Sequence, residues 1–216
     1  MKDIVIYGAG GFGREIACLI KRINDAQDSP IWNLIGFIDD GICEGQQISH
    51  YGKCLGGIDA LNAWNTEIAV IIAIGNPLKV KRIVEKICNK NVSFPNLIAP
   101  DVAIIDPETF SIGKGNIVKD HSSFSCDVTI GNFNVFNGSD FFGHDAKVGD
   151  FNCFMPSIRV SGEVKVGNLN FFGVGCIILQ QIKIGNEVRL GAGAVLMTKP
   201  KDGNLYIGNP AKKFKI

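Results

Sequence analysis

The sequence predicts two domains of different fold class, a Rossmann-like α/β domain at residues 1–100 and a parallel β-helix at residues 101–216. Two patterns predict them. From Ile112 to Leu196 every sixth residue is bulky and apolar, and glycine follows every third of these residues, as in Ile112-Gly113 and Ile184-Gly185. Near the N-terminus, an apolar run leads through a glycine-rich turn into an amphipathic segment, which is typical of a strand, turn and helix.

The first strand is expected at residues 4–7 and the first helix at residues 14–23. Between them, Gly8, Gly10 and Gly13 fit the pattern G-x-G-x-x-G. Glycines in this pattern allow a tight turn and let the amides at a helix N-terminus approach a phosphate. The strand-to-helix context therefore favours a phosphate-binding turn.

Residues 34–38 and 68–74 are the next expected strands, and a helix is expected at residues 79–88. Asp39 and Asp40 follow the second strand, where they either accept hydrogen bonds from a ribose or base or are solvated turn residues. The third strand is almost entirely apolar, as strands buried on both faces are. Together these elements form one βαβαβ-like half, which suits a mononucleotide better than a dinucleotide.

The period of six predicts the β-helix, in which each six-residue rung contributes one inward residue. Three rungs form one coil of 18 residues, and roughly five coils are expected. Strand alternation in a β-sandwich has a period of two and does not predict glycine after every third of these inward residues, which we call anchors. In an α-helix, residues six apart do not share a face.

Composition excludes several classes of partner. The chain has 22 basic and 21 acidic residues, so no overall field attracts nucleic acid or an anionic membrane surface. Seven scattered cysteines have no metal-binding spacing and are expected to be reduced, with no metal bound. The N-terminus shows no secretory signal pattern and no apolar run approaches a membrane span, so the expected location is the cytoplasm.

A family resemblance adds to this interpretation. The hexapeptides of a bulky aliphatic residue followed by glycine, and the closing segment Gly208-Asn209-Pro210-Ala211-Lys212, resemble the hexapeptide-repeat acyltransferases. Nearly the whole chain is similar to the subfamily of sialic acid O-acetyltransferases and nucleotide-amino-sugar N-acetyltransferases. The resemblance implies a left-handed β-helix, acetyl-CoA as co-substrate, and a homotrimer whose sites lie between neighbouring β-helices.

The function that the resemblance implies is acetylation of the amino group of a nucleotide-activated deoxysugar in bacterial surface glycan synthesis. O-acetylation of a sugar of the sialic acid type is the close alternative. The family holds its nucleotide sugar in the N-terminal domain, which implies substrate contacts at one glycine turn and two strand ends. These residues are Gly8, Gly10, Gly11, Phe12, Gly13, Asp39, Asp40, Gly75 and Asn76.

The candidate catalytic residues are His144 and Asp145, just before the Val148-Gly149 anchor. Acyl transfer to an amine or hydroxyl needs a base, and histidine has a suitable pKa. Asp145 can orient the ring and stabilise the imidazolium. A surface histidine beside an incidental acid is the alternative, but the family has His followed by an acid at this rung. Gly162 lies one coil further on, where its amide can donate to the thioester carbonyl; the alternative is a turn glycine.

The C-terminal coils are expected to bind coenzyme A through small residues and cations. The candidates are Gly173, Gly191, Ala192, Gly193, Lys199 and Lys212. The chain departs from the family at four positions. Relatives often have a polar residue in place of Phe12 and a histidine in place of Ala99. Many also have a second histidine near the position of Cys153 and a small residue in place of Arg159.

Other interpretations stay open at this point. A covalent route through Cys153 is conceivable, although a thiol directly before the inward Phe154 is expected to be buried and inert. His121 is expected to be a surface residue, and His50 has no assigned role. The glycine turn alone is also compatible with an NAD-dependent oxidoreductase, and the repeat alone with a non-catalytic β-helix scaffold.

Overall fold

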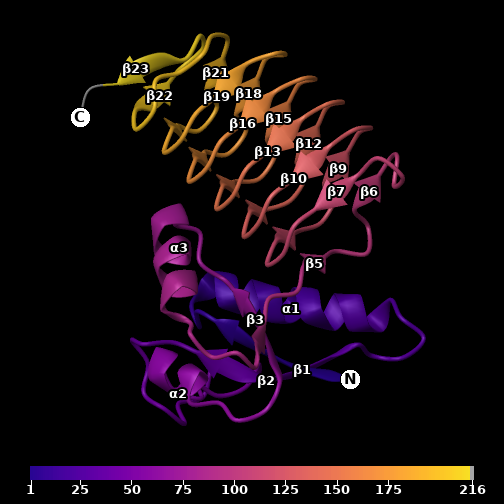
Figure 1. The fold of residues 1–216 in the computed structure, drawn as a ribbon, viewed down its shortest axis with the longest axis vertical. Coiled ribbons are helices and arrows are strands. Elements are labelled where there is room, and N and C mark those ends of the chain that lie inside the picture. Colours follow the sequence, from indigo (N-terminus) through magenta and orange to yellow (C-terminus); the bar gives the residue numbers. More distant parts are fainter. Residues whose placement is uncertain (215–216) are drawn as a thin grey trace. The chain divides into compact units, whose positions relative to one another are not determined.

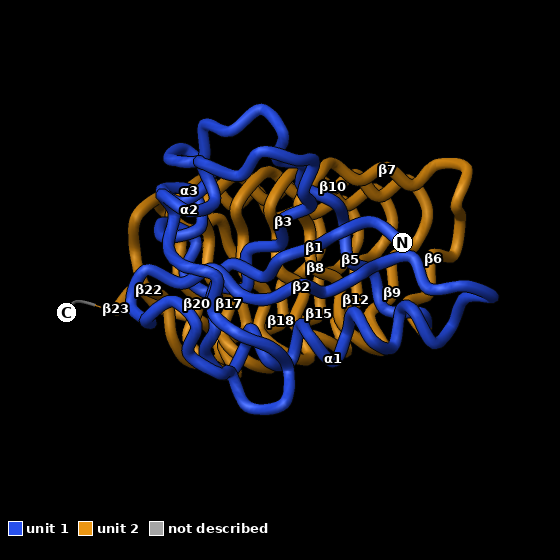
Figure 2. The backbone as a smooth tube through the Cα atoms, turned by 90° about the horizontal axis from the view of Figure 1, so that it is seen from below, with its two compact units in different colours: residues 1–100 blue, residues 101–216 orange. Residues whose placement is uncertain are grey.

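The computed structural model describes residues 1–214. The chain divides into two compact units, Met1–Pro100 (unit 1) and Asp101–Ile216 (unit 2), which Figure 2 draws in blue and orange. Unit 1 is an α/β unit and unit 2 is a parallel β-solenoid (Figure 1). The predicted fold class, an α/β domain followed by a left-handed parallel β-helix, is confirmed.

Unit 1 contains a parallel sheet with the strand order β2-β1-β3-β4 and three helices. The strands are β1 (Lys2–Tyr7), β2 (Trp32–Ile38), β3 (Ile68–Ile72) and β4 (Val92–Ser93), and the helices are α1 (Gly11–Asp25), α2 (Ile58–Asn62) and α3 (Pro77–Lys86). Strand β5 (Leu97–Ile98) lies near the end of the unit.

The core of unit 1 follows from its hydrophobic pattern. All five residues of β3 are buried, as the apolar run predicts for a strand covered on both faces. Helix α1 buries one face, formed by Ile16, Leu19, Ile20 and Ile23. Helix α2 was not predicted, because Leu61 is its only buried residue and gives no helical period.

Unit 2 has three sheets made of short parallel strands, and each is named here after a central strand. The β13 face contains β7 (Ser111–Ile112), β10 (Thr129–Ile130), β13 (Lys147–Val148), β16 (Lys165–Val166) and β19 (Lys183–Ile184). The β12 face contains β6 (Ala103–Ile104), β9 (Ser123–Phe124), β12 (Phe141–Phe142), β15 (Arg159–Val160), β18 (Ile177–Ile178) and β21 (Val195–Leu196). The β14 face contains β8 (Ile117–Val118), β11 (Val135–Phe136), β14 (Cys153–Phe154), β17 (Phe171–Phe172), β20 (Arg189–Leu190) and β22 (Leu205–Ile207), which pairs with antiparallel β23 (Lys212–Phe214).

The number of turns differs from the expectation of roughly five. The β12 face has six strands, because β6 precedes the regular repeat. Ala103 pairs with Ser123 at a spacing of 20 residues rather than 18, so the period of six does not reveal this strand.

The repeated apolar residues point into the solenoid and stack from coil to coil. Phe136, Phe154 and Phe172 are fully buried, and their rings stack with centroid distances of 5.0 and 4.6 Å. Beside them runs a ladder of buried asparagines, Asn116, Asn134, Asn152 and Asn170. Each side-chain amide bonds to the next coil, so these four buried side chains stay paired.

A third regular feature places the side chains at the corners. The third residue after most anchors has a positive φ, as His121, Asp127, Asp145 and Glu163 do. This left-handed conformation costs energy for a non-glycine residue. The cost is offset because the amide of each such corner residue bonds to the neighbouring coil, as Asp145 does to the carbonyl of Cys126 at 3.1 Å.

Candidate active site

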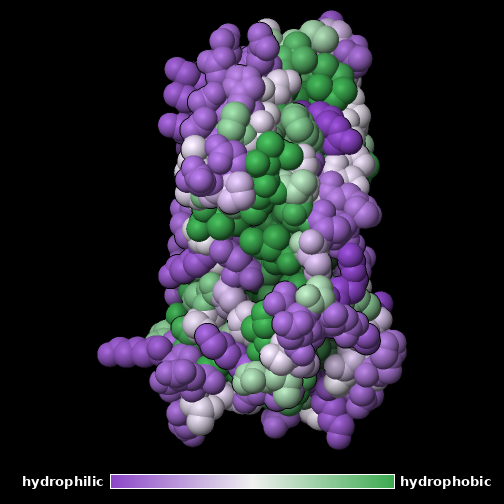
Figure 3. All heavy atoms as spheres, turned by 90° about the vertical axis from the view of Figure 1, so that its right-hand side faces the viewer, coloured by the Kyte–Doolittle hydropathy of each residue, from purple (hydrophilic) through white to green (hydrophobic). Residues whose placement is uncertain are grey.

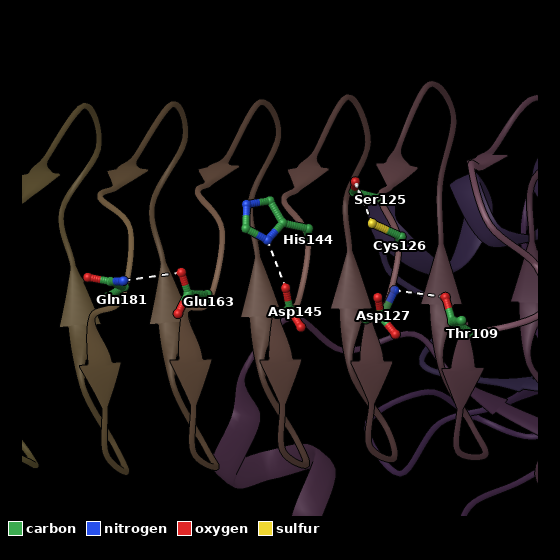
Figure 4. Close-up of polar contacts among 8 residues, drawn as sticks. All are labelled: Thr109, Ser125, Cys126, Asp127, His144, Asp145, Glu163 and Gln181. Carbon is green, nitrogen blue, oxygen red and sulfur yellow. Dashed lines mark hydrogen bonds and ion pairs between the residues drawn. The ribbon is translucent and has the colours of Figure 1, made fainter.

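His144 and Asp145 form an exposed pair at the corner that follows β12. The Nδ1 atom of His144 lies 2.8 Å from Oδ2 of Asp145 (Figure 4). Asp145 has a φ of +59° at this corner, and its carboxylate points back toward the ring of His144. Both side chains are more than half exposed, so the pair is open to a substrate.

The hydrogen bond defines the proton positions on the neutral ring. Because the carboxylate of Asp145 accepts from Nδ1–H, Nε2 keeps a free lone pair. A base with this tautomer can take a proton at Nε2, and the adjacent carboxylate then stabilises the imidazolium. The predicted orienting role of Asp145 therefore has the required geometry.

Gly162 lies against the ring of His144 in the next coil. A Cβ atom at this position would lie only 2.5 Å from Nε2 and 2.7 Å from Cε1 of His144. The two coils are joined here, since the amide of Glu163 donates to the carbonyl of His144 at 2.8 Å. A side chain at this position would therefore displace the ring, and the restriction comes from space rather than from a positive φ.

The amide of Gly162 is available to a ligand. Within residues 1–214 it donates no hydrogen bond. At another corner of the coil, the amide two residues after the anchor is capped by a side chain, as Asn132 N is by Oδ1 of Asp150 at 2.6 Å. An unpaired amide on the glycine that lies against the ring suits stabilisation of a developing oxyanion.

The glycine turn of unit 1 permits a close approach of α1 to β1. Gly8 has a φ of +107°, and a Cβ at Gly13 would lie 1.9 Å from the carbonyl oxygen of Gly8. Gly10 and Gly11 are exposed, and added Cβ atoms there would meet nothing within 4 Å. Phe12 is half-buried. The turn thus leaves its two central glycines open at the start of α1.

Asp39 and Asp40 brace this turn, a role that the sequence did not reveal. Asp39 accepts from the amides of Ala9 and Gly41, each at 2.9 Å. Asp40 accepts from the amide of Ile58 at 2.8 Å and from the hydroxyl of Tyr7. Burial and the bond to Asp40 raise the pKa of Tyr7 well above its ordinary value, so Tyr7 stays a donor.

Gly75 and Asn76 follow β3, beside the glycine turn. Asn76 caps α3, because its Oδ1 accepts from the amide of Lys79 at 3.1 Å. Strand β1 lies between β2 and β3, so the chain adds β2 on one side of β1 and β3 on the other. Ligands of open α/β sheets bind at the carboxyl ends of strands at such a switch point. The predicted substrate residues of unit 1 therefore come together at one edge of its sheet.

Comparison with known proteins agrees with this architecture. Residues 3–87 match the family of the PglD N-terminal domain. The acetyltransferase domain of PglB from Neisseria gonorrhoeae is similar over 99% of both chains, with 26% sequence identity and a TM-score of 0.88. The chain is thus similar to an acetyl-CoA-dependent acetyltransferase over nearly its whole length.

Two further solved structures are similar over nearly the whole chain. WeeI from Acinetobacter baumannii has 25% identity and a TM-score of 0.86, over 99% of this chain and 100% of that chain. PerB from Caulobacter crescentus, in complex with CoA and GDP-perosamine, has 23% identity and a TM-score of 0.86, over 100% and 98% of the two chains. At that identity the likeness to PerB shows the fold. No curated protein sequence matches the chain.

The remaining titratable candidates of the acetyltransferase are less suited to catalysis. Cys153 is 2% exposed, as expected, and burial raises the pKa of its thiol to about 12, with the charge of Asp140 adding to the rise. A thiolate is therefore scarce at neutral pH. His121 forms a second pair with Asp101, with Nδ1 2.7 Å from Oδ2, at a different corner. His50 contacts Ser49 and Tyr51 in a loop of unit 1.

The small residues predicted to line a coenzyme A groove serve first to stack the coils. A Cβ at Gly173 would lie 2.6 Å from the amide nitrogen of Ala192, and one at Gly191 would lie 2.7 Å from Cγ2 of Ile207. Gly193 is an open corner with a φ of +65°. Lys199 and Lys212 are both exposed, and Lys212 lies in β23. Their contact with the cofactor stays a prediction.

The described residues contain neither a metal-binding cluster nor a membrane-spanning helix. Residues 1–214 contain no group of three or more His, Cys, Asp or Glu side chains placed to hold a metal ion. In the same range, no helix combines the length and apolar character needed to cross a bilayer.

Proposed function

We propose that this acetyltransferase moves the acetyl group of acetyl-CoA to the amino group of a nucleotide-activated deoxysugar, in bacterial surface glycan synthesis. The observation that carries the proposal is the His144–Asp145 pair, whose Nε2 lies against Gly162. The relatives support it: the PglB domain was solved with acetyl coenzyme A, and the perosamine N-acetyltransferase with CoA and GDP-perosamine.

The geometry suggests the following reaction. The neutral amine of the sugar attacks the thioester carbonyl while Nε2 of His144 accepts its proton. Asp145 stabilises the imidazolium, and the amide of Gly162 donates to the oxyanion as charge develops there. The tetrahedral intermediate then collapses. The sulfur of coenzyme A leaves with the bonding electrons and takes the proton from His144, which restores the base.

The nucleotide sugar is assigned to unit 1. The turn at residues 8–13 and the residues after β3 lie at the carboxyl ends of neighbouring strands. Gly10 and Gly11 open the first turn of α1, where backbone amides suit a diphosphate. Asp39 and Asp40 keep lone pairs beyond their internal bonds, and these remain candidates for the ribose or base.

The active unit is proposed to be a homotrimer. Several large apolar side chains on or next to the β12 face are exposed, among them Phe141 at 40%, Ile177 at 38% and Met197 at 46%. Figure 3 shows hydrophobic surface gathered in a strip along unit 2. The guanidinium of Arg159 bends onto the carbonyls of Ser139 and Ile158 at 2.5 and 3.1 Å, which leaves neighbouring apolar groups uncovered. Apolar patches of this kind mark interfaces.

Light scattering tests the assembly. A mass of three chains is expected at micromolar concentration, and Ile177→Glu should lower it because a charge would be buried at the interface. The exposed Lys86→Glu change is a matched control that should keep the trimer. A monomeric wild type would contradict the shared-site arrangement.

A thiol-release assay tests the chemistry. Acetyl-CoA is supplied with a panel of nucleotide amino-sugars and, separately, with free sugars that include sialic acid. Release with the amino-sugars alone supports N-acetylation, whereas release with sialic acid alone would identify an O-acetyltransferase. A thermal shift with NAD and none with acetyl-CoA would overturn the proposal in favour of an oxidoreductase.

A further inference from the structure

We propose that a column of three lysines beside His144 binds the diphosphate group of one of the two substrates. The column consists of Lys147, Lys165 and Lys183, which are the outward residues of three consecutive strands of the β13 face. The inference rests on the proposed function, because it assumes that the substrates are a coenzyme A thioester and a nucleotide sugar.

The three lysines line one pocket that adjoins the catalytic pair. Its volume is about 440 Å³, and its lining consists of Asp145, Lys147, Glu163, Lys165, Gln181 and Lys183. Asp145 belongs both to this pocket and to the pair with His144. A group held by the lysines therefore lies near the place where the acyl group is transferred.

The register of the strands brings the three cations together. Lys147 pairs with Lys165, and Lys165 pairs with Lys183. Neighbouring strands lie about 4.8 Å apart, so the column spans roughly 10 Å. Three cations over this length suit an extended polyanion with charges on several oxygens better than a single carboxylate.

In the described part of the chain, no carboxylate pairs directly with these three lysines. Among residues 1–214, none of the three side chains forms a hydrogen bond or an ion pair. The two acids of the lining bond elsewhere, since Asp145 accepts from His144 and Glu163 accepts from Gln181 at 3.1 Å (Figure 4), and the lining as a whole carries three cations against two anions. Like charges directly opposite on neighbouring strands are destabilising. A bound anion would remove this repulsion.

The diphosphate is the polyanion that the two proposed substrates share. Coenzyme A has a diphosphate between its pantetheine and adenosine parts, and a nucleotide sugar has one between sugar and nucleoside. The previously predicted phosphate ligands Lys199 and Lys212 do not line this pocket. The lysine column is therefore a separate candidate, and its ligand is decided by measuring both substrates.

Isothermal titration calorimetry tests the column with four probes: CoA, 3′-dephospho-CoA, UDP and GDP. The variants are Lys165→Gln and the triple change of Lys147, Lys165 and Lys183 to Gln. A triple change of the exposed Lys2, Lys90 and Lys213 to Gln removes the same charge elsewhere and serves as the control. All four proteins are compared by circular dichroism, and these exposed substitutions should leave the fold unchanged.

We expect Lys165→Gln to weaken one class of ligand about tenfold and the triple change about 100-fold or more, since each lysine loses a charge-assisted contact. Equal loss for CoA and 3′-dephospho-CoA, with the nucleotides unaffected, assigns the column to the coenzyme's diphosphate. Loss for UDP or GDP alone assigns it to the acceptor. The salt dependence of that affinity should also become weaker in the triple variant.

Two outcomes overturn the inference in different ways. If the wild type binds CoA or a nucleotide and neither lysine variant differs from the control, only the lysine column is wrong. If the wild type binds none of the four probes, the proposed function fails, and the inference fails with it.

Discussion

Replacing Gly162 with alanine should disable the enzyme while leaving it folded. The added methyl would lie 2.5 Å from Nε2 of His144, whereas an ordinary contact is at least 3.4 Å. The ring must therefore move by about 1 Å. The backbone itself tolerates alanine, because Gly162 does not have a positive φ. Displacement of a catalytic group by about 1 Å can cost ~100-fold in rate, so we expect kcat to fall about 100-fold.

Steady-state kinetics with acetyl-CoA and an amino-sugar acceptor measure this loss, with the melting temperature as a check on folding. The control is the same change in a His144→Ala background, where no ring remains to be displaced. In that background Gly162→Ala should have little further effect, so the two changes should be strongly non-additive. Additive losses, or a Gly162→Ala enzyme with wild-type kcat, would refute the described contact between Gly162 and the base.

Two predictions concern the interior of unit 2. Burial raises the pKa of Asp140 from 3.8 to about 8, so between those values the unfolded chain releases a proton that the folded state keeps. The free energy of unfolding should then decrease as pH rises from about 4 to 8 and level off above. Asp140→Asn should remove most of this pH dependence and stabilise the protein by several kcal/mol at pH 8, as measured by urea unfolding. An unchanged pH dependence in this variant would argue against a buried neutral Asp140. The side chain of Asn152 makes four bonds, to Asn134, Gly167 and Asn170. Asn152→Ala should therefore cost roughly 3 kcal/mol or more by leaving buried partners unpaired. A loss below about 1 kcal/mol in the same experiment would show that the ladder contributes little.

The regular part of the fold was predictable because its signal is local. Phe136, Phe154 and Phe172 fall on the period of six, and all three are buried in one stack. The irregular parts left no such signal. Strand β6 departs from the 18-residue spacing, and α2 has one buried residue, so neither produces a periodic pattern.

The candidate site shows the same division. A period of 18 places Gly162 next to His144, and the structure has this contact. Bonds between distant segments could not be read from spacing. The bonds from Ala9 and Tyr7 that make Asp39 and Asp40 structural braces depend on how β1 and β2 pair. The pair of His121 with Asp101 likewise joins the repeat to a segment that precedes it.

The central claim is that His144 is the general base, and kcat/KM over a pH series for His144→Ala and Cys153→Ala tests it most directly. We predict that His144→Ala lowers kcat/KM by ~10²–10⁴-fold while acetyl-CoA affinity stays near wild type. Cys153→Ala should keep most of its activity, because burial raises the pKa of this thiol and leaves little thiolate near neutral pH. An active His144→Ala enzyme together with an inactive Cys153→Ala enzyme would contradict the account and indicate a covalent thiol route.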